Sequence, residues 1–478
     1  MAFVGFLFSH TISTHNMDTF STLLLLLILF SCVSLSAAHN ITQIKSDESI
    51  LHALKSHITS DPFNMLKNNW TSGTSFCTWI GVTCDSRRSR VTKLNISDMG
   101  LEGSIPQEIG NLSSLAYLDM SGNSFHGRLP KNICSHNNLQ RLKLLDLSSN
   151  KLQGDIPSSL YQCPQLESID LSRNSFGGYV PAQISNITLL KELDLGVNNL
   201  RGRLPKDICS HNNLQRLKLL NLSRNEMEGD IPSSLYQCPQ LESIDLSDNY
   251  FGGYVPTQIW NITLLKVLDL SWNNLIGRLP KDICSHNNLQ RLKLLNLSRN
   301  EMEGDIPSSL YQCPQLESID LSDNYFGGYV PTQIWNITLL KVLDLSWNNL
   351  IGRLPNDICS HNNLQRLKLL DLSFNKLEGD IPSSLYQCPQ LESIDLSRNS
   401  FGGLVPTQIW NITLLKELDL SHNNLRDFGE NGKATALASN DILQFLNAQS
   451  NNKIGHTPKS VKSGNILFSF WGLRRNGF

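Results

Sequence analysis

The segment Leu142–Pro157, LKLLDLSSNKLQGDIP, decides the fold. Leucines alternate with other residues around Asp146, which predicts a short β-strand that buries one face. The Asn, Gly and Pro that follow are residues that turn a chain. The frame LxxLxLxxNxLxGxIP recurs fourteen times, at steps of 24 residues except for four steps of 27. The second strand Leu or Ile of each unit is Leu94, Leu118, Leu145, Ile169, Leu193, Leu220, Ile244, Leu268, Leu295, Ile319, Leu343, Leu370, Ile394 or Leu418.

A fixed period of this length predicts a solenoid, in which each coil packs only against its neighbours. Strands of successive coils would pair in parallel about 4.8 Å apart. The Asn of each unit, such as Asn150 or Asn174, would bond backbone groups that the turn leaves unpaired. Thirteen units have this Asn, which we call the ladder Asn, and the first has Met99 instead. We expect a curved α/β superhelix with a parallel sheet on its concave face and short helical or irregular segments on its convex face.

A longer period is also present. Residues 206–280 and 281–355 are identical at all 75 positions, and residues 131–205 and 356–425 are close relatives of them. The array therefore grew by copying blocks of three coils, although an error of sequence assembly would leave the same pattern.

The composition argues against nucleic acid as a partner. The 478 residues carry a formal net charge of -2, and no long run of Lys or Arg is present. A chain with so little net charge has no strong field to attract a polyanion.

The N-terminus predicts export. Residues 23–30 read LLLLLILF and are followed by small residues, so we expect residues 1–38 to be a signal peptide. The alternative is an uncleaved membrane anchor, but the apolar run is short for a spanning helix. We expect the secretory pathway and a final location that is extracellular or on the outer face of the plasma membrane.

Ten cysteines remain after Cys32 leaves with the signal, in a compartment that favours disulfides. Eight of them alternate at spacings of 29 and 46 residues: Cys134, Cys163, Cys209, Cys238, Cys284, Cys313, Cys359 and Cys388. A step of 29 is about one coil, which brings two cysteines within ~5 Å and allows pairs such as Cys134–Cys163. The alternative is a set of free cysteines that pack in the core.

Glycosylation sequons agree with export. We expect glycans at Asn69 and, on the convex side, at Asn111, Asn186, Asn261, Asn336 and Asn411. Asn40 is a further sequon, whereas Asn95, Asn221 and Asn296 lie on the strand column, where a glycan would shield the concave face.

The residue just before each ladder Asn is predicted to face outward and varies from coil to coil. We call these residues the recognition strip: Ser149, Arg173, Val197, Arg224, Asp248, Trp272, Arg299, Asp323, Trp347, Phe374, Arg398 and His422. Tyr250 and Tyr325 follow the ladder Asn and flank it. Exposed aromatic and Arg side chains dominate binding hot spots. We therefore expect the strip from Arg173 to His422 to bind a ligand, although Trp272 and Trp347 could be one residue copied once.

No constellation of residues indicates catalysis, a metal or a cofactor. His136, His211, His286 and His361 recur with the copied blocks, so duplication explains them. An Asp column follows the strands and is expected to be structural: Asp119, Asp146, Asp170, Asp194, Asp245, Asp269, Asp320, Asp344, Asp371, Asp395 and Asp419.

The LxGxIP repeat resembles that of plant leucine-rich-repeat receptor kinases and receptor-like proteins. Apolar residues recur at helical spacing over Asp47–Ile58, and Trp70 and the segment Cys77–Cys84, CTWIGVTC, follow. This region looks like the N-terminal cap of that family. Its amino-acid sequence is most similar to that of the receptor kinases that include sensors of microbial patterns. The resemblance implies a leucine-rich-repeat solenoid, a cap over residues 39–90, repeats over 91–426 and a disulfide between Cys77 and Cys84.

The resemblance also implies an extracellular recognition module without enzymatic activity, which binds a peptide or protein ligand on its concave face and works with a membrane co-receptor. One alternative is a secreted inhibitor of a cell-wall-degrading enzyme, similar to polygalacturonase inhibitors. Another is a truncated receptor fragment without function, because residues 427–478 are polar and carry no cysteine pair or long apolar run. We expect that tail to be disordered.

Overall fold

The computed structural model describes residues 47–426, except 88, 136–137, 211–212, 286–287, 361–363, 406–407 and 410–411. The expected signal peptide, the tail, Asn40, Asn411 and the four repeated histidines lie outside the described residues. The chain divides into two compact units at Phe326/Gly327. Unit 1 and unit 2 are taken separately below.

Each coil contributes one short strand to a parallel sheet, which confirms the expected solenoid. Unit 1 contains β3 (Val91–Asn95), β5 (Tyr117–Asp119), β7 (Leu144–Asp146), β9 (Ser168–Asp170), β11 (Glu192–Asp194), β13 (Leu219–Asn221), β15 (Ser243–Asp245), β17 (Val267–Asp269), β19 (Leu294–Asn296) and β21 (Ser318–Asp320). Unit 2 contains β23 (Val342–Asp344), β25 (Leu369–Asp371), β27 (Ser393–Asp395) and β29 (Glu417–Asp419). Neighbouring strands pair in register, so Leu118 lies opposite Leu145 and Leu145 opposite Ile169. This register keeps the frame leucines in one buried column.

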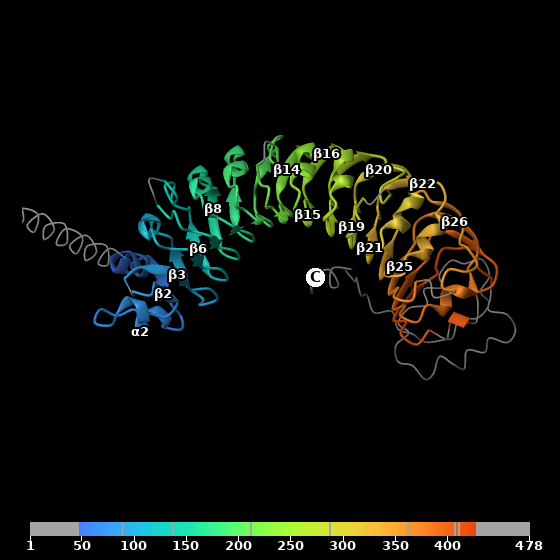
Figure 1. The fold of residues 1–478 in the computed structure, drawn as a ribbon. Helices are drawn as coiled ribbons and strands as arrows, with labels where there is room; N and C mark the ends of the chain where they lie inside the picture. The colour runs from blue at the N-terminus through green and yellow to red at the C-terminus, as the bar shows by residue number, and fades with distance from the viewer. Residues whose placement is uncertain are drawn as a thin grey trace, which may run out of the picture. The chain divides into compact units, whose positions relative to one another are not determined.

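A second set of parallel strands was not predicted. It comprises β4 (Glu102–Ser104), β6 (Ser124–Gly127), β8 (Lys151–Asp155), β10 (Ser175–Gly177), β12 (Arg201–Gly202), β14 (Glu226–Asp230), β16 (Tyr250–Tyr254), β18 (Asn274–Gly277), β20 (Glu301–Asp305), β22 (Tyr325–Gly327), β24 (Ile351–Arg353), β26 (Lys376–Asp380) and β28 (Ser400–Gly402). The sequence analysis treated this stretch as a turn because it ends in Gly and Pro. In unit 1, β14, β16 and β20 lie on the outer side of the arc, and β15, β19 and β21 lie on its inner side (Figure 1).

The segment after each Pro forms at most a short 3-10 helix, as its length predicts. These helices are η2 (Gln107–Asn111), η3 (Ser158–Gln162), η4 (Ala182–Asn186), η5 (Ser233–Gln237), η6 (Thr257–Asn261), η7 (Ser308–Gln312), η8 (Thr332–Asn336) and η9 (Ser383–Gln387). Each of them has a Pro as its N-cap residue, from Pro106 to Pro382. The fixed φ of Pro directs the chain into the helical turn. In the described part of the chain, no helix is both long and apolar enough to cross a bilayer.

The ladder Asn ties neighbouring coils together, as expected. Asn150 Nδ2 donates to the carbonyl oxygens of Leu147 (3.1 Å), Ser148 (3.1 Å) and, in the preceding coil, Met120 (3.0 Å). Its Oδ1 accepts the backbone N–H of Phe125 at 2.9 Å. One half-buried amide thus hydrogen-bonds backbone groups of two coils, and Met120 O and Leu147 O each accept from a second ladder Asn as well, Asn123 and Asn174.

The cysteines form the bonds that their spacing suggested. Unit 1 contains the Cys134–Cys163, Cys209–Cys238 and Cys284–Cys313 disulfides, and unit 2 contains Cys359–Cys388. Their Cα separations are 5.2–5.3 Å, and the eight residues are at most 3% exposed. Each bond clamps a 27-residue coil, which carries a three-residue insertion, to the next coil.

The N-terminal cap closes the first coil. Its helix covers residues 47–56, two residues fewer than expected, because Ile58 begins β1 (Ile58–Ser60), which pairs antiparallel with β4. The cap also contains α2 (Met65–Asn69), η1 (Phe76–Thr78) and β2 (Val82–Cys84).

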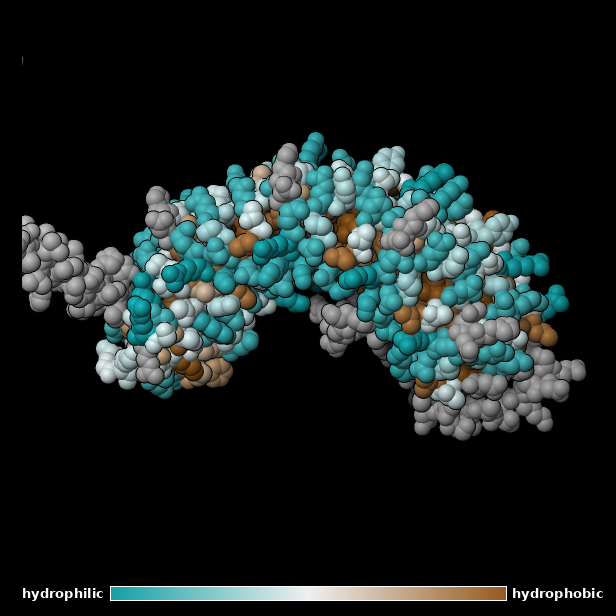
Figure 2. Space-filling view, in the orientation of Figure 1, coloured by the Kyte–Doolittle hydropathy of each residue, from teal (hydrophilic) through white to brown (hydrophobic). Residues whose placement is uncertain are grey.

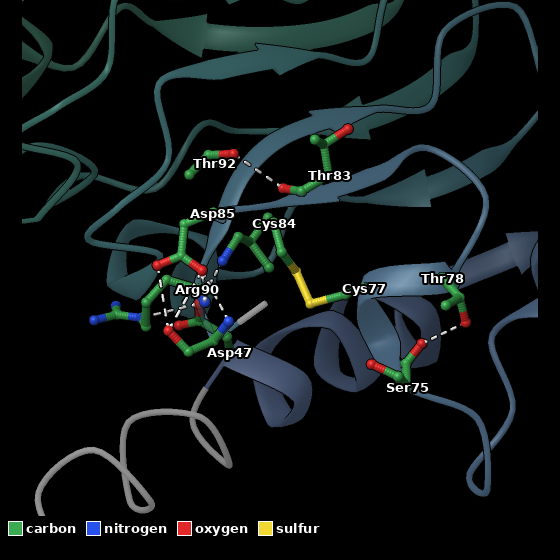
Figure 3. Close-up of a disulfide and its surroundings, with 11 residues drawn as sticks. Asp47, Ser75, Cys77, Thr78, Thr83, Cys84, Asp85, Arg90 and Thr92 are labelled. Carbon is green, nitrogen blue, oxygen red and sulfur yellow. Dashed lines mark hydrogen bonds and ion pairs between the residues drawn. A yellow bond between two sulfur atoms is a disulfide. The ribbon is translucent and has the colours of Figure 1, made fainter. Parts of the chain in front are cut away.

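Figure 3 shows how the cap is fastened. The Cys77–Cys84 disulfide, with a Cα separation of 5.5 Å, joins η1 to β2, which pairs antiparallel with β3. Buried Asp47 accepts from Arg90 Nε at 3.1 Å and from the backbone N–H of Val91 at 2.8 Å. The helix and the first repeat strand are therefore held by a shared carboxylate.

The ladder predicts the effect of removing one amide. In Asn249→Ala, the Met227 N–H loses its acceptor and three carbonyl oxygens lose a donor. We expect the free energy of unfolding, measured by chemical denaturation of the oxidised protein, to fall by about 1–3 kcal/mol. Asn199→Ala, at an exposed position beside a ladder Asn, serves as the control and is expected to change it by less than about 0.5 kcal/mol. Equal effects of the two substitutions would contradict the ladder.

Candidate functional site

The recognition strip has an unusual backbone conformation. All twelve of its residues, from Ser149 to His422, have φ between 53° and 57°. This left-handed conformation is uncommon for residues other than Gly and costs roughly 1–2 kcal/mol each. The equivalent residues of the first two coils are Asp98 and Gly122. Only one of the fourteen coils therefore has Gly, the residue that this conformation favours, at the position. Buried Leu139, Leu214, Leu289 and Leu364 also have positive φ, so the strip is distinguished by its exposed or half-buried side chains together with this conformation.

The surrounding hydrogen bonds explain this turn. The N–H of Trp272 donates to Ser298 O at 2.8 Å, and the N–H of Asn273 donates to Arg299 O at 3.1 Å. Asn273 turns inward to serve as a ladder Asn. The left-handed turn reverses direction between the two residues, so the strip side chain projects away from the core.

Unit 1 gathers five predicted residues around one shallow depression of about 330 Å³. Its lining residues are Asp248, Asn249, Tyr250, Trp272, Asn273, Asn274, Arg299, Asn300, Glu301 and Asp323. The guanidinium carbon of Arg299 lies 3.8 Å from the Trp272 ring centre. Arg299 Nε also lies 3.8 Å from Asp323 Oδ2, and Arg224 Nε lies 3.9 Å from Asp248 Oδ2. Charged side chains of opposite sign therefore alternate with one aromatic ring along this part of the strip.

Unit 2 carries an aromatic stack instead. The rings of Trp347 and Phe374 lie 3.6 Å apart at 15°, and the Arg398 guanidinium carbon lies 4.7 Å from the Phe374 ring centre. Trp347 is 53% exposed, whereas Phe374 is half-buried between its neighbours. His422 is exposed at the end of the same row.

The remaining predicted residues are not all brought together. Arg173 is exposed but lies outside both groups, and Tyr325, 60% exposed, does not line the depression. Trp272 is half-buried rather than fully exposed because Arg299 covers one ring face. The sequence analysis missed Asn274 and Glu301, which hold the position of Tyr250 in their coils. That offset from the ladder Asn was the signal that could have identified them.

The Asp column caps the strand ends. Asp170 Oδ1, for example, accepts the N–H of Ser172 at 2.9 Å. In-register pairing places carboxylates of neighbouring coils opposite one another, as with Asp371 between Asp344 and Asp395. Such alignment of like charges is unfavourable.

Burial and this alignment raise the pKa values of carboxyl groups in the Asp column. Burial raises the pKa of Asp194 to about 6. Burial, together with the carboxylates of Asp344 and Asp395, raises the pKa of Asp371 well above its usual range. In the copied blocks Asn296 takes the place of Asp371 and donates to Asp269 Oδ2 at 3.1 Å, which replaces repulsion by a hydrogen bond.

The sequons fall into two structural groups. Asn111, Asn186, Asn261 and Asn336 are exposed and end 3-10 helices, and Asn69 is exposed in the cap. Asn296, on a strand, is 7% exposed, and its Oδ1 accepts from Ser298 N–H at 3.1 Å. Glycosylation at the exposed sites stays a prediction.

The raised pKa of Asp371 predicts a pH-dependent gain in stability. A carboxyl with a folded pKa above its unfolded value destabilises the native state at neutral pH, and this penalty disappears as pH falls through the folded pKa. Asp371→Asn should therefore raise the free energy of unfolding by up to about 1 kcal/mol near pH 8, and the gain should shrink toward pH 5.

The reciprocal variant Asn296→Asp should be destabilised near neutral pH and recover on acidification. Asp371→Asn creates an Asn-Leu-Ser sequon, so both variants require an oxidising bacterial host that adds no glycans. A gain for Asp371→Asn that is the same at all pH values would contradict the charge repulsion.

Comparison with known proteins places the fold in a family. The N-terminal domain model of leucine-rich repeat proteins matches residues 44–85. Leucine-rich repeat models match residues 114–136 and 135–176 and, in overlapping segments, 215–425, which is more than half of the chain.

The similar proteins are plant receptors. The chain is 37% identical over 89 residues to the LRR receptor-like serine/threonine-protein kinase EFR of Arabidopsis thaliana, which is 19% of this chain and 9% of EFR. The ectodomain of the Arabidopsis receptor kinase HAESA, in complex with an IDA peptide hormone ligand, superposes with a TM-score of 0.68 and 30% identity, over 80% of this chain and 66% of HAESA.

The plant peptide hormone receptor RGFR1, in complex with RGF2, superposes with a TM-score of 0.63 and 33% identity, over 68% of this chain and 50% of RGFR1. The matched region thus spans a small part of EFR and no more than about two thirds of either ectodomain. The repeat frame, the N-terminal cap and these similarities together show that the chain belongs to the leucine-rich repeat family and has the fold of a plant receptor ectodomain.

Proposed function

We propose that this protein is an extracellular recognition module that binds a peptide or protein ligand along the recognition strip. The observation that carries the proposal is the set of side chains, other than Gly, held in left-handed conformation in twelve successive coils. Glycine would relieve that strain in every one of them. Binding accounts for the retention of large and charged side chains there, whereas a purely structural turn does not.

The similar structures support a ligand of this class. The plant peptide hormone receptor RGFR1 was solved in complex with RGF2, and HAESA was solved with an IDA peptide hormone ligand. Neither complex identifies the ligand of this chain, because the residues of the strip differ from coil to coil. A membrane co-receptor is part of the same proposal, as a second protein partner.

The exposed side chains of the strip differ between the two units, and each set favours a different kind of ligand side chain. In unit 1, three carboxylates, Asp248, Glu301 and Asp323, surround Trp272 and the single cation Arg299 among the lining residues. A basic side chain fits this environment, since it gains both charge contacts and an aromatic face.

In unit 2, the stacked rings of Trp347 and Phe374 offer an apolar surface. An aliphatic or aromatic side chain would bury it. The expected ligand of unit 1 is therefore a peptide or protein segment with a basic side chain, and that of unit 2 is a segment with an apolar side chain.

The strip predicts which substitutions weaken binding. Peptides selected on the secreted protein from a random display library should bind Arg299→Ala or Trp347→Ala about 5- to 150-fold more weakly, which is ~1–3 kcal/mol for a hot-spot residue. The free energy of unfolding should hardly change, because the two side chains are 51% and 53% exposed.

Arg291→Ala and Tyr236→Ala, exposed residues outside the strip, provide charge-matched and aromatic controls. Wild-type affinity of both strip variants would contradict the proposal. Selective retention of a cell-wall glycosidase from plant extracts, with no peptide selected, would favour the inhibitor alternative instead.

A further inference from the structure

A second ordered surface lies at the ends of the outer strands of unit 1. In the coils of unit 1 from Gly127 to Gly304, a left-handed Gly near the end of each outer strand is followed by an exposed residue, and the type of that residue repeats in the order Arg, Asp, Tyr with the three-coil block. We call the last five of these residues the flank stripe: Arg203, Asp230, Tyr254, Arg278 and Asp305. They end or directly follow β12, β14, β16, β18 and β20, which pair in sequence.

The side chains of the flank stripe are fixed by packing. Four of them, all except Asp305, lie over the Gly of the next coil, so that a Cβ on Gly277 would come 2.5 Å from Tyr254 Cδ1. A Cβ on Gly253 would come 2.5 Å from Asp230 Oδ1, and one on Gly229 would come 2.8 Å from Arg203 Cγ. These glycines are needed for their positive φ and for this close approach. The stripe is therefore a row of ordered side chains, which lose little conformational entropy on contact.

The order of residues makes the charges of the flank stripe complementary to those of a second copy that runs in the opposite direction. A second copy rotated by a two-fold axis through Tyr254 places Tyr254 against Tyr254. The same rotation places Asp230 opposite Arg278, and Arg203 opposite Asp305, on both sides of the axis. Every charged residue of the stripe meets an opposite charge, which is the condition for an isologous interface. We propose that unit 1 forms a homodimer through the flank stripe, with Tyr254 at its centre.

The centre of this surface is apolar and its ends are charged. Tyr254 is 70% exposed and pairs in register with Ile276, which is 36% exposed. Tyr179 lies outside the flank stripe but holds the same place in an earlier coil of unit 1. It has Arg201 beside it instead of an apolar residue, and the guanidinium carbon of Arg201 lies 5.9 Å from the Tyr179 ring centre. An apolar centre with a charged rim is the usual anatomy of an interface, so Tyr254 is preferred to Tyr179 as the axis.

Existing contacts leave the charges available. Arg278 Nε lies 3.6 Å from Glu303 Oε1, but the two side chains are 73% and 60% exposed. An ion pair this exposed contributes little and is easily exchanged for another. Four ladder steps of about 4.8 Å make a contact of ~19 Å, which indicates a weak dimer at the lower end of specific interface sizes.

Sedimentation velocity of the secreted protein tests the dimer. The protein is treated with a glycosidase first, so that no glycan at the predicted site Asn261, seven residues after Tyr254, can block the contact. We expect reversible dimerisation as the concentration rises into the high micromolar range. The double variant Arg203→Asp/Arg278→Asp should weaken it on the order of tenfold or more, because every charged contact becomes repulsive. The double variant Asp230→Arg/Asp305→Arg should do the same.

Mixing these two double variants should restore association as a heterodimer, since each Asp of one then faces an Arg of the other. Misfolding cannot produce that rescue. Arg216→Asp/Arg291→Asp mixed with Asp230→Arg/Asp305→Arg carries the same opposite net charges outside a matched stripe and should not form a heterodimer, which separates the stripe from a general attraction. Arg216→Asp/Arg291→Asp, which makes the same charge change outside the stripe, should dimerise like the wild type. Tyr254→Ser should weaken the dimer, whereas Tyr179→Ser should not. A wild-type monomer at all concentrations, or double variants that fail to associate when mixed, would overturn the proposal.

Discussion

One asparagine amide, present in thirteen of the fourteen coils, fixes the rest of the architecture. Asn150 accepts a hydrogen bond from the outer strand of the preceding coil and donates to carbonyl oxygens on the inner side, so it spans the distance between the two sheets. Its own N–H donates to Arg173 O of the next coil at 3.1 Å. With the asparagine turned inward, the residue before it can only leave the strand outward, in left-handed conformation. The recognition strip is thus a consequence of the ladder that holds the coils together.

Much of the fold follows from the sequence because the repeat fixes it many times over. A buried Leu or Ile recurs once per coil at the centre of each strand. Because every coil must bury this residue in the same place, neighbouring strands pair in the parallel register seen between Leu118 and Leu145. Cysteine spacing allowed the disulfides for the same reason, since 29 residues bring Cys209 and Cys238 to adjacent coils, but free cysteines packed in the core fitted the same spacing. Local patterns of residues sufficed for the period and the register.

Features that depend on the neighbouring coil were not predictable in this way. The outer strands end in Gly and Pro, which are poor strand formers, and they pair because the inner sheet and the ladder bring them into register. Ile58 lies on a helical pattern but belongs to a strand, because β4 offers it a partner. Nothing in the identity of Trp272 or Phe374 indicates a positive φ, which is set by the turn after the strand, because Asp98 has a φ of 53° although Met99 and not Asn follows it.

Copying of blocks preserved the main chain but diversified the surface. Trp272 and Trp347 occupy the same place in two identical blocks, yet Arg299 covers the first and Phe374 stacks on the second. The difference lies in the following coil, because each exposed side chain rests on its neighbour. A solenoid can therefore duplicate a block without loss of stability and alter recognition by one substitution in the next coil.

In the Asp column, by contrast, one substitution of Asp by Asn changes two properties at once, the charge repulsion and the presence of a sequon. Asn296 removes the repulsion that Asp371 suffers, but Asn followed by Leu-Ser is also a sequon. In the folded coil the Asn296 amide is buried and engaged with Asp269 and Ser298, so a glycan there would compete with the hydrogen bonds that close the strand end. Asn261, exposed at the end of η6, has no such conflict. The Asn296 sequon is thus inaccessible once its coil has formed, whereas Asn261 stays open to the glycosylation that the sequence predicts there.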